Sequence, residues 1–236
     1  SRSQIMRRLG VRFSRRPAYR KDVGTIQIPK RIKRGEEKEI EIEYKTLECD
    51  GVANAEHSKK AVEKFLRGSG IKPKEPHFKL SVHPNSSVSV NEIEAILKRW
   101  ELYDGFVPDV IIIDYADILA PEPNTGQLNI RDQINSTWKA LRRLSQEKHC
   151  LVIAPTQADA ASYNQTLLDL RNFSEDKRKL SHVTGMLGLN QTKEEKGRGI
   201  MRLNWIVLRE DNFQTDRCLY VGQCLTLGRA FSCCTL

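Results

Sequence analysis

The sequence predicts an α/β protein: a mostly parallel sheet flanked by helices, antiparallel strands at the C-terminal edge and a small β-hairpin insertion. Two apolar runs, Val110–Ile113 and Cys150–Ala154, are typical of strands buried on both faces. Between them, Ile130–Gln146 repeats apolar residues at helical spacing. A strand, a helix and a second strand in this order favour a layered α/β architecture.

The N-terminal region predicts a helix followed by a β-hairpin. Residues 2–16 have apolar side chains at every fourth position and arginines over much of the remainder, and Pro17 ends this helix. Val23–Ile28 and Glu39–Leu47 are expected strands, and in the second one apolar residues alternate with glutamates. Their charged connection, Pro29–Lys38, is typical of an exposed hairpin.

The same periodicities predict the remaining elements. His57–Leu66 is an expected short helix, and Phe78–His83 is an expected strand. A longer helix is expected to begin at Asn91 as its N-cap, with Glu94 three residues further on. The last third of the chain predicts consecutive antiparallel strands at Met201–Leu208, Cys218–Cys224 and Arg229–Cys233.

Positive charge is concentrated at one end of the chain. The formal net charge is +9, and the first 34 residues hold 12 of the 39 basic residues but only one of the 30 acidic ones, Asp22. Such a block is either a surface for phosphate or nucleic acid, or a solvated helix face. No apolar run approaches the roughly 20 residues of a membrane-spanning helix, and the start lacks the apolar segment of a secretory signal. Because the six cysteines form no Cys-x-x-Cys pair, we expect reduced, intracellular thiols and no zinc site.

Two polar residues follow the two apolar runs. Asp114 comes directly after Val110–Ile113, at the strand end where α/β folds place ligands. Four apolar residues and an aspartate form the Walker B pattern, in which the carboxylate holds the water shell of a nucleotide-bound Mg²⁺. Gln157 lies 43 residues later, after the second run, and an amide at this edge can sense a γ-phosphate or orient water. By itself, Gln157 could equally be a cap of a helix or loop.

The stretch from about Leu80 to Arg209 resembles the RecA-fold ATPase core of DnaB-type replicative helicases, especially its phage-like members. The segments that carry the resemblance are Pro108–Tyr115, Ile130–Leu144 with Leu151–Gln157, Leu187–Thr192 with Met201–Asn204, and the initial helix Ser1–Leu9. The resemblance implies a RecA-like core and a chain that works with ATP, Mg²⁺ and single-stranded DNA in a ring, expected to be a hexamer. It also implies a cytoplasmic location in a bacterial or phage-infected cell.

The chain departs from that family at one decisive motif. It contains no Gly-x-x-x-x-Gly-Lys-[Ser/Thr] and no Gly-Lys dipeptide at all, so the P-loop that cradles phosphates is absent from these residues. In the resembling family this loop lies just upstream of the segment corresponding to Ser1. We therefore expect an N-terminally incomplete core that does not hydrolyse ATP alone. A degenerate relative remains the alternative.

The resemblance also suggests the remaining functional residues. Arg209 occupies the place of an arginine that reaches a neighbouring subunit's γ-phosphate, although a surface arginine paired with Glu210 or Asp211 is an equal alternative. Arg202 is a second candidate for the same role. The loops 120–129 and 158–182 correspond to segments that touch single-stranded DNA. The second contains the aromatic residues Tyr163 and Phe173 and the basic residues Arg171, Lys177, Arg178 and Lys179.

These expectations combine into one domain division and three functional hypotheses. We divide the chain into a core helix (1–19), an insertion with the hairpin and short helix (20–76), and the rest of the RecA-like core (77–236). The leading hypothesis is the C-terminal portion of an ATP-dependent DNA helicase, with Asp114 as Mg²⁺ ligand and Gln157 and Arg209 as further site residues. The alternatives are a non-catalytic nucleic-acid-binding or scaffold protein, and a metal-dependent nuclease that uses Asp109, Asp114 and Asp117.

Overall fold

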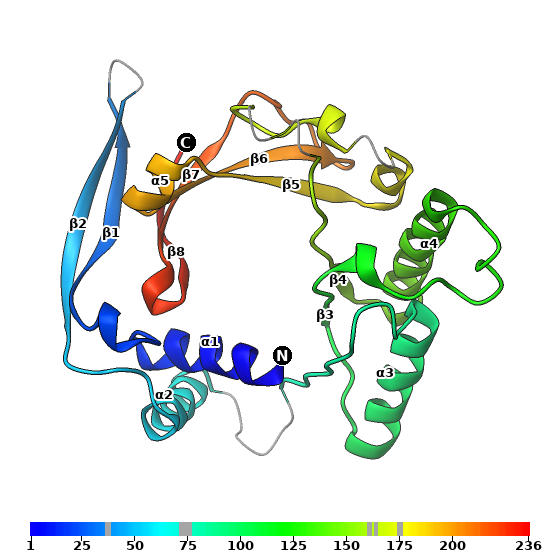
Figure 1. Ribbon diagram of the computed structural model, residues 1–236, viewed down its shortest axis with the longest axis horizontal. Coiled ribbons are helices and arrows are strands. Elements are labelled where there is room, and N and C mark those ends of the chain that lie inside the picture. Colours follow the sequence, from blue (N-terminus) through cyan, green and yellow to red (C-terminus); the bar gives the residue numbers. More distant parts are fainter. Residues whose placement is uncertain (36–38, 71–76, 160–161, 163–164, 174–176) are drawn as a thin grey trace. The chain divides into compact units, whose positions relative to one another are not determined.

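The computed structural model describes residues 1–35, 39–70, 77–159, 162, 165–173 and 177–236, apart from the side chain of Lys177. They form two compact units, which are considered separately (Figure 1). Unit 1 comprises Ser1–Glu75, Gly188–Asn204 and Gln214–Leu236, and unit 2 comprises Pro76–Leu187 and Trp205–Phe213. Within the described residues, no helix combines the length and the apolar character that crossing a bilayer requires.

Unit 1 combines helices with a β-hairpin and part of an antiparallel sheet. Its complete elements are α1 (Arg2–Ser14), β1 (Gly24–Arg34), β2 (Ile40–Cys49), α2 (Ala55–Gly68), α5 (Lys193–Arg198), β7 (Leu219–Cys224) and β8 (Arg229–Thr235). Strands β5 (Gly185–Asn190) and β6 (Ile200–Leu208) contribute residues to both units, and the sheet order is β5-β6-β7-β8. The β6–β7 and β7–β8 pairs are antiparallel, which confirms the predicted C-terminal strands.

The helix and hairpin at the N-terminus match the sequence prediction closely. Strands β1 and β2 pair antiparallel with Gly24 opposite Cys49. The inner face of the hairpin is buried with residues of β7 and of the short 3₁₀ helix that follows it, in a cluster comprising Ile26, Ile28, Cys49, Cys224 and Leu227. Helix α1 packs on α2, where the rings of Phe13 and Phe65 lie 5.3 Å apart. The hairpin therefore belongs to the hydrophobic core of unit 1.

Unit 2 is built around a short parallel ladder. Its elements are α3 (Val90–Asp104), β3 (Val110–Ile112), α4 (Ile130–Lys148) and β4 (Leu151–Ile153), with short 3₁₀ helices at Ala116–Ile118, Leu170–Asn172 and Lys177–His182. Strands β3 and β4 are parallel, as predicted, with Val110 opposite Leu151 and Ile112 opposite Ile153. The apolar faces of α3 and α4 are buried against these strands, with Leu97, Ile111, Trp138, Leu141 and Leu144 among the core residues.

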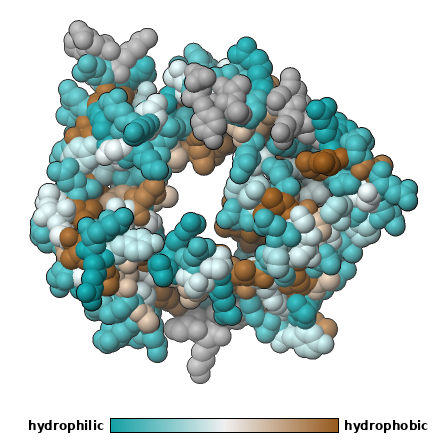
Figure 2. Space-filling model, in the orientation of Figure 1, coloured by the Kyte–Doolittle hydropathy of each residue, from teal (hydrophilic) through white to brown (hydrophobic). Residues whose placement is uncertain are grey.

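Two expectations for unit 2 are wrong. Strands β3 and β4 are buried on one face only: Ile111 is buried, whereas Val110, Ile112 (69% exposed), Leu151 and Ile153 are exposed. The helices cover the face that carries Ile111, and period-2 alternation places the other residues on the opposite face. Residues 77–83 form no strand, because this part of the described chain has no pairing partner. Figure 2 shows hydrophobic patches among mainly hydrophilic residues on the viewed face.

Helix α3 begins earlier than its sequence predicts. Its N-cap is Ser89 rather than Asn91, and the Ser89 hydroxyl accepts a hydrogen bond from the Glu92 amide while the Glu92 carboxylate accepts one from the Ser89 amide at 2.7 Å. This backbone hydrogen bond, with a second one from the Ser89 hydroxyl, lowers the pKa of Glu92. The sequence thus correctly predicts a capping box at the start of this helix, but it places the N-cap two residues too far along the chain.

The cap can be tested directly by urea unfolding. Ser89→Ala removes an acceptor from the first turn of α3 and is expected to lower the free energy of unfolding by about 1 kcal/mol. Asn91→Ala is the matched control, because Asn91 is an exposed residue inside the helix and alanine is the better helix former. A larger loss for Asn91→Ala than for Ser89→Ala would restore the sequence-based assignment.

Candidate functional site

The two polar residues predicted from the sequence follow neighbouring parallel strands. Asp114 follows β3, and Gln157 lies four residues beyond the end of β4. The ladder continues past the strands, since the Ile113 amide donates to the Ile153 carbonyl at 3.0 Å. Both side chains are exposed, and neither is hydrogen-bonded or ion-paired to any residue that the structure describes. This carboxyl edge of β3 and β4 leaves a carboxylate and an amide free for a ligand.

A second aspartate near Asp114, Asp117, connects several segments at this edge through its hydrogen bonds. The Asp117 carboxylate accepts hydrogen bonds from the Trp138 indole at 3.2 Å and from the Thr156 hydroxyl at 2.5 Å. The Lys179 ammonium donates to the Thr156 hydroxyl at 2.7 Å and lies 3.8 Å from an Asp117 oxygen. It also lies 5.7 Å from the centroid of the Phe173 ring.

This network joins four segments of unit 2. Asp117 belongs to the 3₁₀ helix after β3, Thr156 follows β4, Trp138 lies in α4, and Lys179 lies in the 3₁₀ helix Lys177–His182. The side chains of Lys179 and Asp117 are only 9% and 19% exposed. A nearly buried charge pair must satisfy its hydrogen-bonding groups, and here Thr156 and Trp138 supply the partners. The segment after β4 is thereby tied to both strand ends.

The structure changes the assignment of the predicted nucleic-acid-binding residues. Lys179 is buried against Asp117 and Thr156, and Phe173 is buried as well, so neither side chain lies at the surface, and the DNA contact of Lys179 stays a prediction. Arg171 is exposed and forms a two-pronged pair with Asp169 that raises the pKa of the guanidinium. The side chain of Lys177 and residue Tyr163 lie outside the described residues.

Arg178 is exposed and lies against α4. Its guanidinium is 2.6 Å from the Asp132 carboxylate, and this hydrogen bond is the main reason why the pKa of Asp132 is lowered. Asp132 lies in the first turn of the helix, where Asn129 is the N-cap. The His182 ring, from the same 3₁₀ helix as Arg178, forms a hydrogen bond of 2.8 Å with Asn135 of α4. Arg171 and Arg178 thus remain candidates for DNA contacts, each with an acidic partner.

The two arginines considered for a role in a neighbouring subunit bind their own chain. Arg209 donates from Nε to the Val183 carbonyl at 2.7 Å and from Nη2 to the Ser181 carbonyl at 2.7 Å. Arg202 is buried and pairs with Glu195 through two contacts of 2.7 and 3.1 Å. The role of Arg209 across a subunit boundary therefore stays a prediction. Arg202 differs from Arg209 in that its partner is a charged side chain and the pair is nearly buried.

The residues present fit a single-ligand role in Mg²⁺ binding. Asp114 offers an exposed carboxylate without a protein partner among the described residues, whereas both oxygens of Asp117 accept hydrogen bonds. The described residues contain no group of three His, Cys, Asp or Glu side chains that could hold a metal. Asp109 and Asp114 lie at opposite ends of β3, roughly 15 Å apart along an extended strand. The described structure therefore gives the nuclease hypothesis no metal centre.

The similarity of this chain to known proteins lies in its structure and not in its sequence. No protein-family model matches the sequence, and no curated protein is significantly similar to it. The structure superposes on a solved helicase ATPase domain with a TM-score of 0.66 and 13% identity, over 97% of this chain and 70% of that one. The chain therefore has the fold of that ATPase domain, a RecA-like α/β fold. A DnaB-like replicative helicase solved with its primase interactions gives the same TM-score and identity, over 99% of this chain and 49% of that one.

The RecA-like fold extends further along the chain than the sequence resemblance does. The resemblance leaves residues 20–76 unassigned, whereas the superposition on the solved ATPase domain covers 97% of the chain and thus most of that segment. At 13% identity this similarity establishes the fold alone. The chain spans about half the length of the DnaB-like helicase and 70% of the ATPase domain.

Sequence reasoning missed the Asp117–Thr156–Lys179 network. Thr156 immediately precedes Gln157, and Asp117 comes three residues after Asp114, so the clustering of polar residues behind both strands was an available signal. Nothing in the sequence indicates that Lys179, 23 residues after Thr156, returns to the same edge. Long-range partners of this kind depend on the path of the loop rather than on local periodicity.

Proposed function

We propose that this chain forms the C-terminal portion of the ATPase core of a DnaB-type, ATP-dependent DNA helicase or translocase. The observation that carries the proposal is the parallel β3–β4 pair with Asp114 and Gln157 at its carboxyl edge, both without a partner among the residues that the structure describes. The RecA-like fold supports it, because nucleotide sites in open α/β sheets lie at that edge. The proposal includes assembly into a ring, expected to be a hexamer, around single-stranded DNA.

Each candidate residue receives a role that its chemistry allows. Asp114 would hold the water shell of Mg²⁺, which would neutralise charge on the transferred phosphoryl group when bound. Gln157 would contact the γ-phosphate or the attacking water. The Asp117–Thr156–Lys179 network would act as a positioning device, because it joins the residue before Gln157 to the segment that bears Arg171 and Arg178.

The chain needs a phosphate-binding loop that its own residues do not supply. It contains no Gly-Lys dipeptide, so no lysine of a P-loop can reach the β- and γ-phosphates. In the proposed assembly, this loop comes from polypeptide outside these 236 residues. We therefore expect the isolated chain to be inactive and the protein from the complete reading frame to hydrolyse ATP.

ATP hydrolysis by the protein from the complete reading frame tests the proposal. Asp114→Ala is expected to lower kcat by on the order of 100-fold or more, since it removes a group that orients the metal at the transferred phosphoryl. Asp109→Ala is the matched control at the other end of the same strand and is expected to change kcat by less than about threefold.

Two outcomes would count against this account. Asp114-dependent hydrolysis by the isolated 236-residue chain would overturn the requirement for an external P-loop. A complete reading frame that lacks Gly-x-x-x-x-Gly-Lys-[Ser/Thr] and has no ATPase activity would favour the non-catalytic nucleic-acid-binding alternative.

A further inference from the structure

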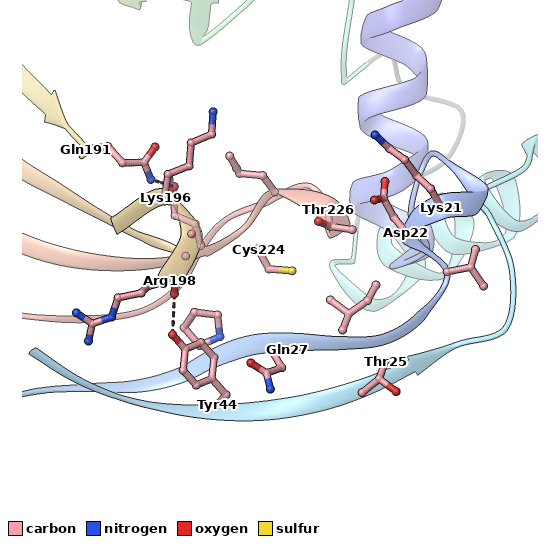
Figure 3. A pocket seen from close by; sticks show the side chains of 17 residues that line it. Lys21, Asp22, Thr25, Gln27, Tyr44, Gln191, Lys196, Arg198, Cys224 and Thr226 are labelled. Atoms are coloured by element: carbon pink, nitrogen blue, oxygen red, sulfur yellow. Dashed lines mark hydrogen bonds between the residues drawn. The ribbon is translucent and has the colours of Figure 1, made fainter. Parts of the chain in front are cut away.

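Unit 1 contains a cavity that the proposed ATPase site does not use. It encloses about 550 Å³, which lies within the range of small-ligand pockets. Its lining comes from the 3₁₀ helix Arg20–Asp22, both strands of the hairpin, α5 and the end of β7. Figure 3 shows Lys21 and Lys196 flanking this space, with Cys224 and Gln27 between them.

The charge of the cavity is positive and largely uncompensated. Three basic residues, Lys21, Lys196 and Arg198, line it together with a single acidic residue, Asp22. Both lysines are exposed, and neither forms an ion pair with any residue that the structure describes. Arg198 differs, since its guanidinium donates to the Ile40 carbonyl and lies 4.0 Å from Glu194. Two ammonium groups are therefore available to an anion.

The helix that carries Lys196 is held firmly in place. It ends at Gly199, whose φ of +70° favours glycine, and a Cβ there would lie 2.7 Å from the Gln223 carbonyl oxygen. The Tyr44 hydroxyl donates to the Arg198 carbonyl at 2.9 Å, and the buried Arg202–Glu195 pair joins α5 to β6. The position of the Lys196 backbone is thus fixed by contacts of its helix and cap with β2, β6 and β7.

A basic and aromatic cluster adjoins the cavity through Lys21. The Tyr19 ring is 54% exposed, and both the Lys21 ammonium and the Arg7 guanidinium lie 5.9 Å from its centroid. Arg7 also has no ion-pair partner among the described residues. Exposed aromatic rings among cations are typical of surfaces that bind single-stranded nucleic acid.

We propose that the Lys21–Lys196 cavity and the adjoining Tyr19 cluster bind the sugar-phosphate backbone of a single-stranded nucleic acid. Lys21 and Lys196 contact phosphates, and the exposed amide of Gln27, which also lines the cavity, can donate to a phosphate or sugar oxygen. The concave shape of the cavity suits a strand better than the surface of a bilayer. The site requires neither ATP nor Asp114.

Fluorescence anisotropy with a labelled oligonucleotide of about 20 deoxythymidines, measured without ATP on the protein from the complete reading frame at about 50 and about 200 mM salt, tests this site. Lys196→Ala and Lys21→Ala are each expected to raise Kd about fivefold and to reduce the salt slope by about 0.7. Lys193→Ala is the matched control, because Lys193 lies exposed on the same helix but does not line the cavity. It is expected to change Kd less than about twofold.

A further variant adds an acidic group to the lining of the cavity at Gly197. A Cβ at Gly197 meets nothing within 4 Å, so Gly197→Glu is accommodated and is expected to raise Kd more than about tenfold. Equal effects of Lys193→Ala and Lys196→Ala would overturn the proposal, since only total charge would then matter. So would binding to vesicles with about 30% phosphatidylserine but not to the oligonucleotide. Because the assay contains no ATP, its result is independent of the ATPase test.

Discussion

Asp117→Ala is expected to lower the free energy of unfolding of the chain by about 3–5 kcal/mol, the range for breaking a buried charge pair from one side. The substitution leaves the Lys179 ammonium, 9% exposed, without a counter-charge, and it removes the acceptor of the Trp138 indole. Urea unfolding monitored by tryptophan fluorescence measures the loss. Asp114→Ala is the control, because that exposed carboxylate has no partner among the described residues and should change the stability by less than about 0.5 kcal/mol.

Removal of Lys179, the other member of the pair, should lower the free energy of unfolding less than removal of Asp117 does. Lys179→Met deletes the buried charge, while Asp117 still accepts hydrogen bonds from Trp138 and Thr156. We expect a loss of about 1–2 kcal/mol, less than for Asp117→Ala, because methionine retains most of the apolar stem of lysine. Equal and small effects of both substitutions would show that the network does not hold the segment after β4 to the strand ends.

Glu195→Ala in unit 1 is expected to cost about 3 kcal/mol for the same physical reason. The Arg202 side chain is only 7% exposed, and Glu195 supplies its charge partner. Glu194→Ala is the matched control, since the neighbouring Glu194 is 83% exposed and lies 4.0 Å from Arg198. That substitution should change the free energy of unfolding by less than about 0.5 kcal/mol.

A double variant separates charge burial from other effects at this position. Glu195→Ala with Arg202→Met removes both charges and should recover most of the stability lost in the single variant, because no unpaired guanidinium remains buried. Chemical denaturation of the wild type, both single variants and the double variant completes the cycle. If the double variant is as unstable as Glu195→Ala alone, the loss arises from the capping hydrogen bond between the Thr192 amide and the Glu195 carboxylate rather than from the buried charge.

The sequence allowed the elements with strong periodicity to be predicted, and tertiary context decided the rest. The hairpin, α1, α4 and the parallel β3–β4 pair follow from local patterns. The exposure of the outer face of β3 and β4 does not follow from them. A run of β-branched residues does not indicate whether one or both faces of a strand are covered. The cap of α3 was misplaced because Ser89 and Asn91 are both good caps followed by glutamate at the third position.

The candidate site was predictable only where it follows a strand end. Asp114 and Gln157 were found because each directly or closely follows an apolar run, and the parallel pairing of those runs places them at one edge. The resemblance places Lys179 in a loop that contacts nucleic acid, and its basic neighbours favour the same interpretation, yet its side chain is buried. Composition cannot distinguish a lysine that faces solvent from one that a folded loop returns to the core.

The cavity of unit 1 shows the same limit for the basic N-terminal region. From the sequence, Arg7 and Lys21 belong to a general excess of positive charge, and Tyr19 is an aromatic residue among them. The structure gathers them at one place and adds Lys196 from α5, which is far away in the chain. The binding partner of these basic residues is therefore inferred from this one surface and not from the net charge of the chain.

The most direct test of the central claim is the rate of ATP hydrolysis by the protein from the complete reading frame, with single-stranded DNA and Mg²⁺ present. We expect activity in the wild type and in Asp109→Ala, and a loss on the order of 100-fold or more in Asp114→Ala. Hydrolysis that is unchanged by Asp114→Ala would contradict the assignment of the carboxyl edge of β3 and β4 as the nucleotide site.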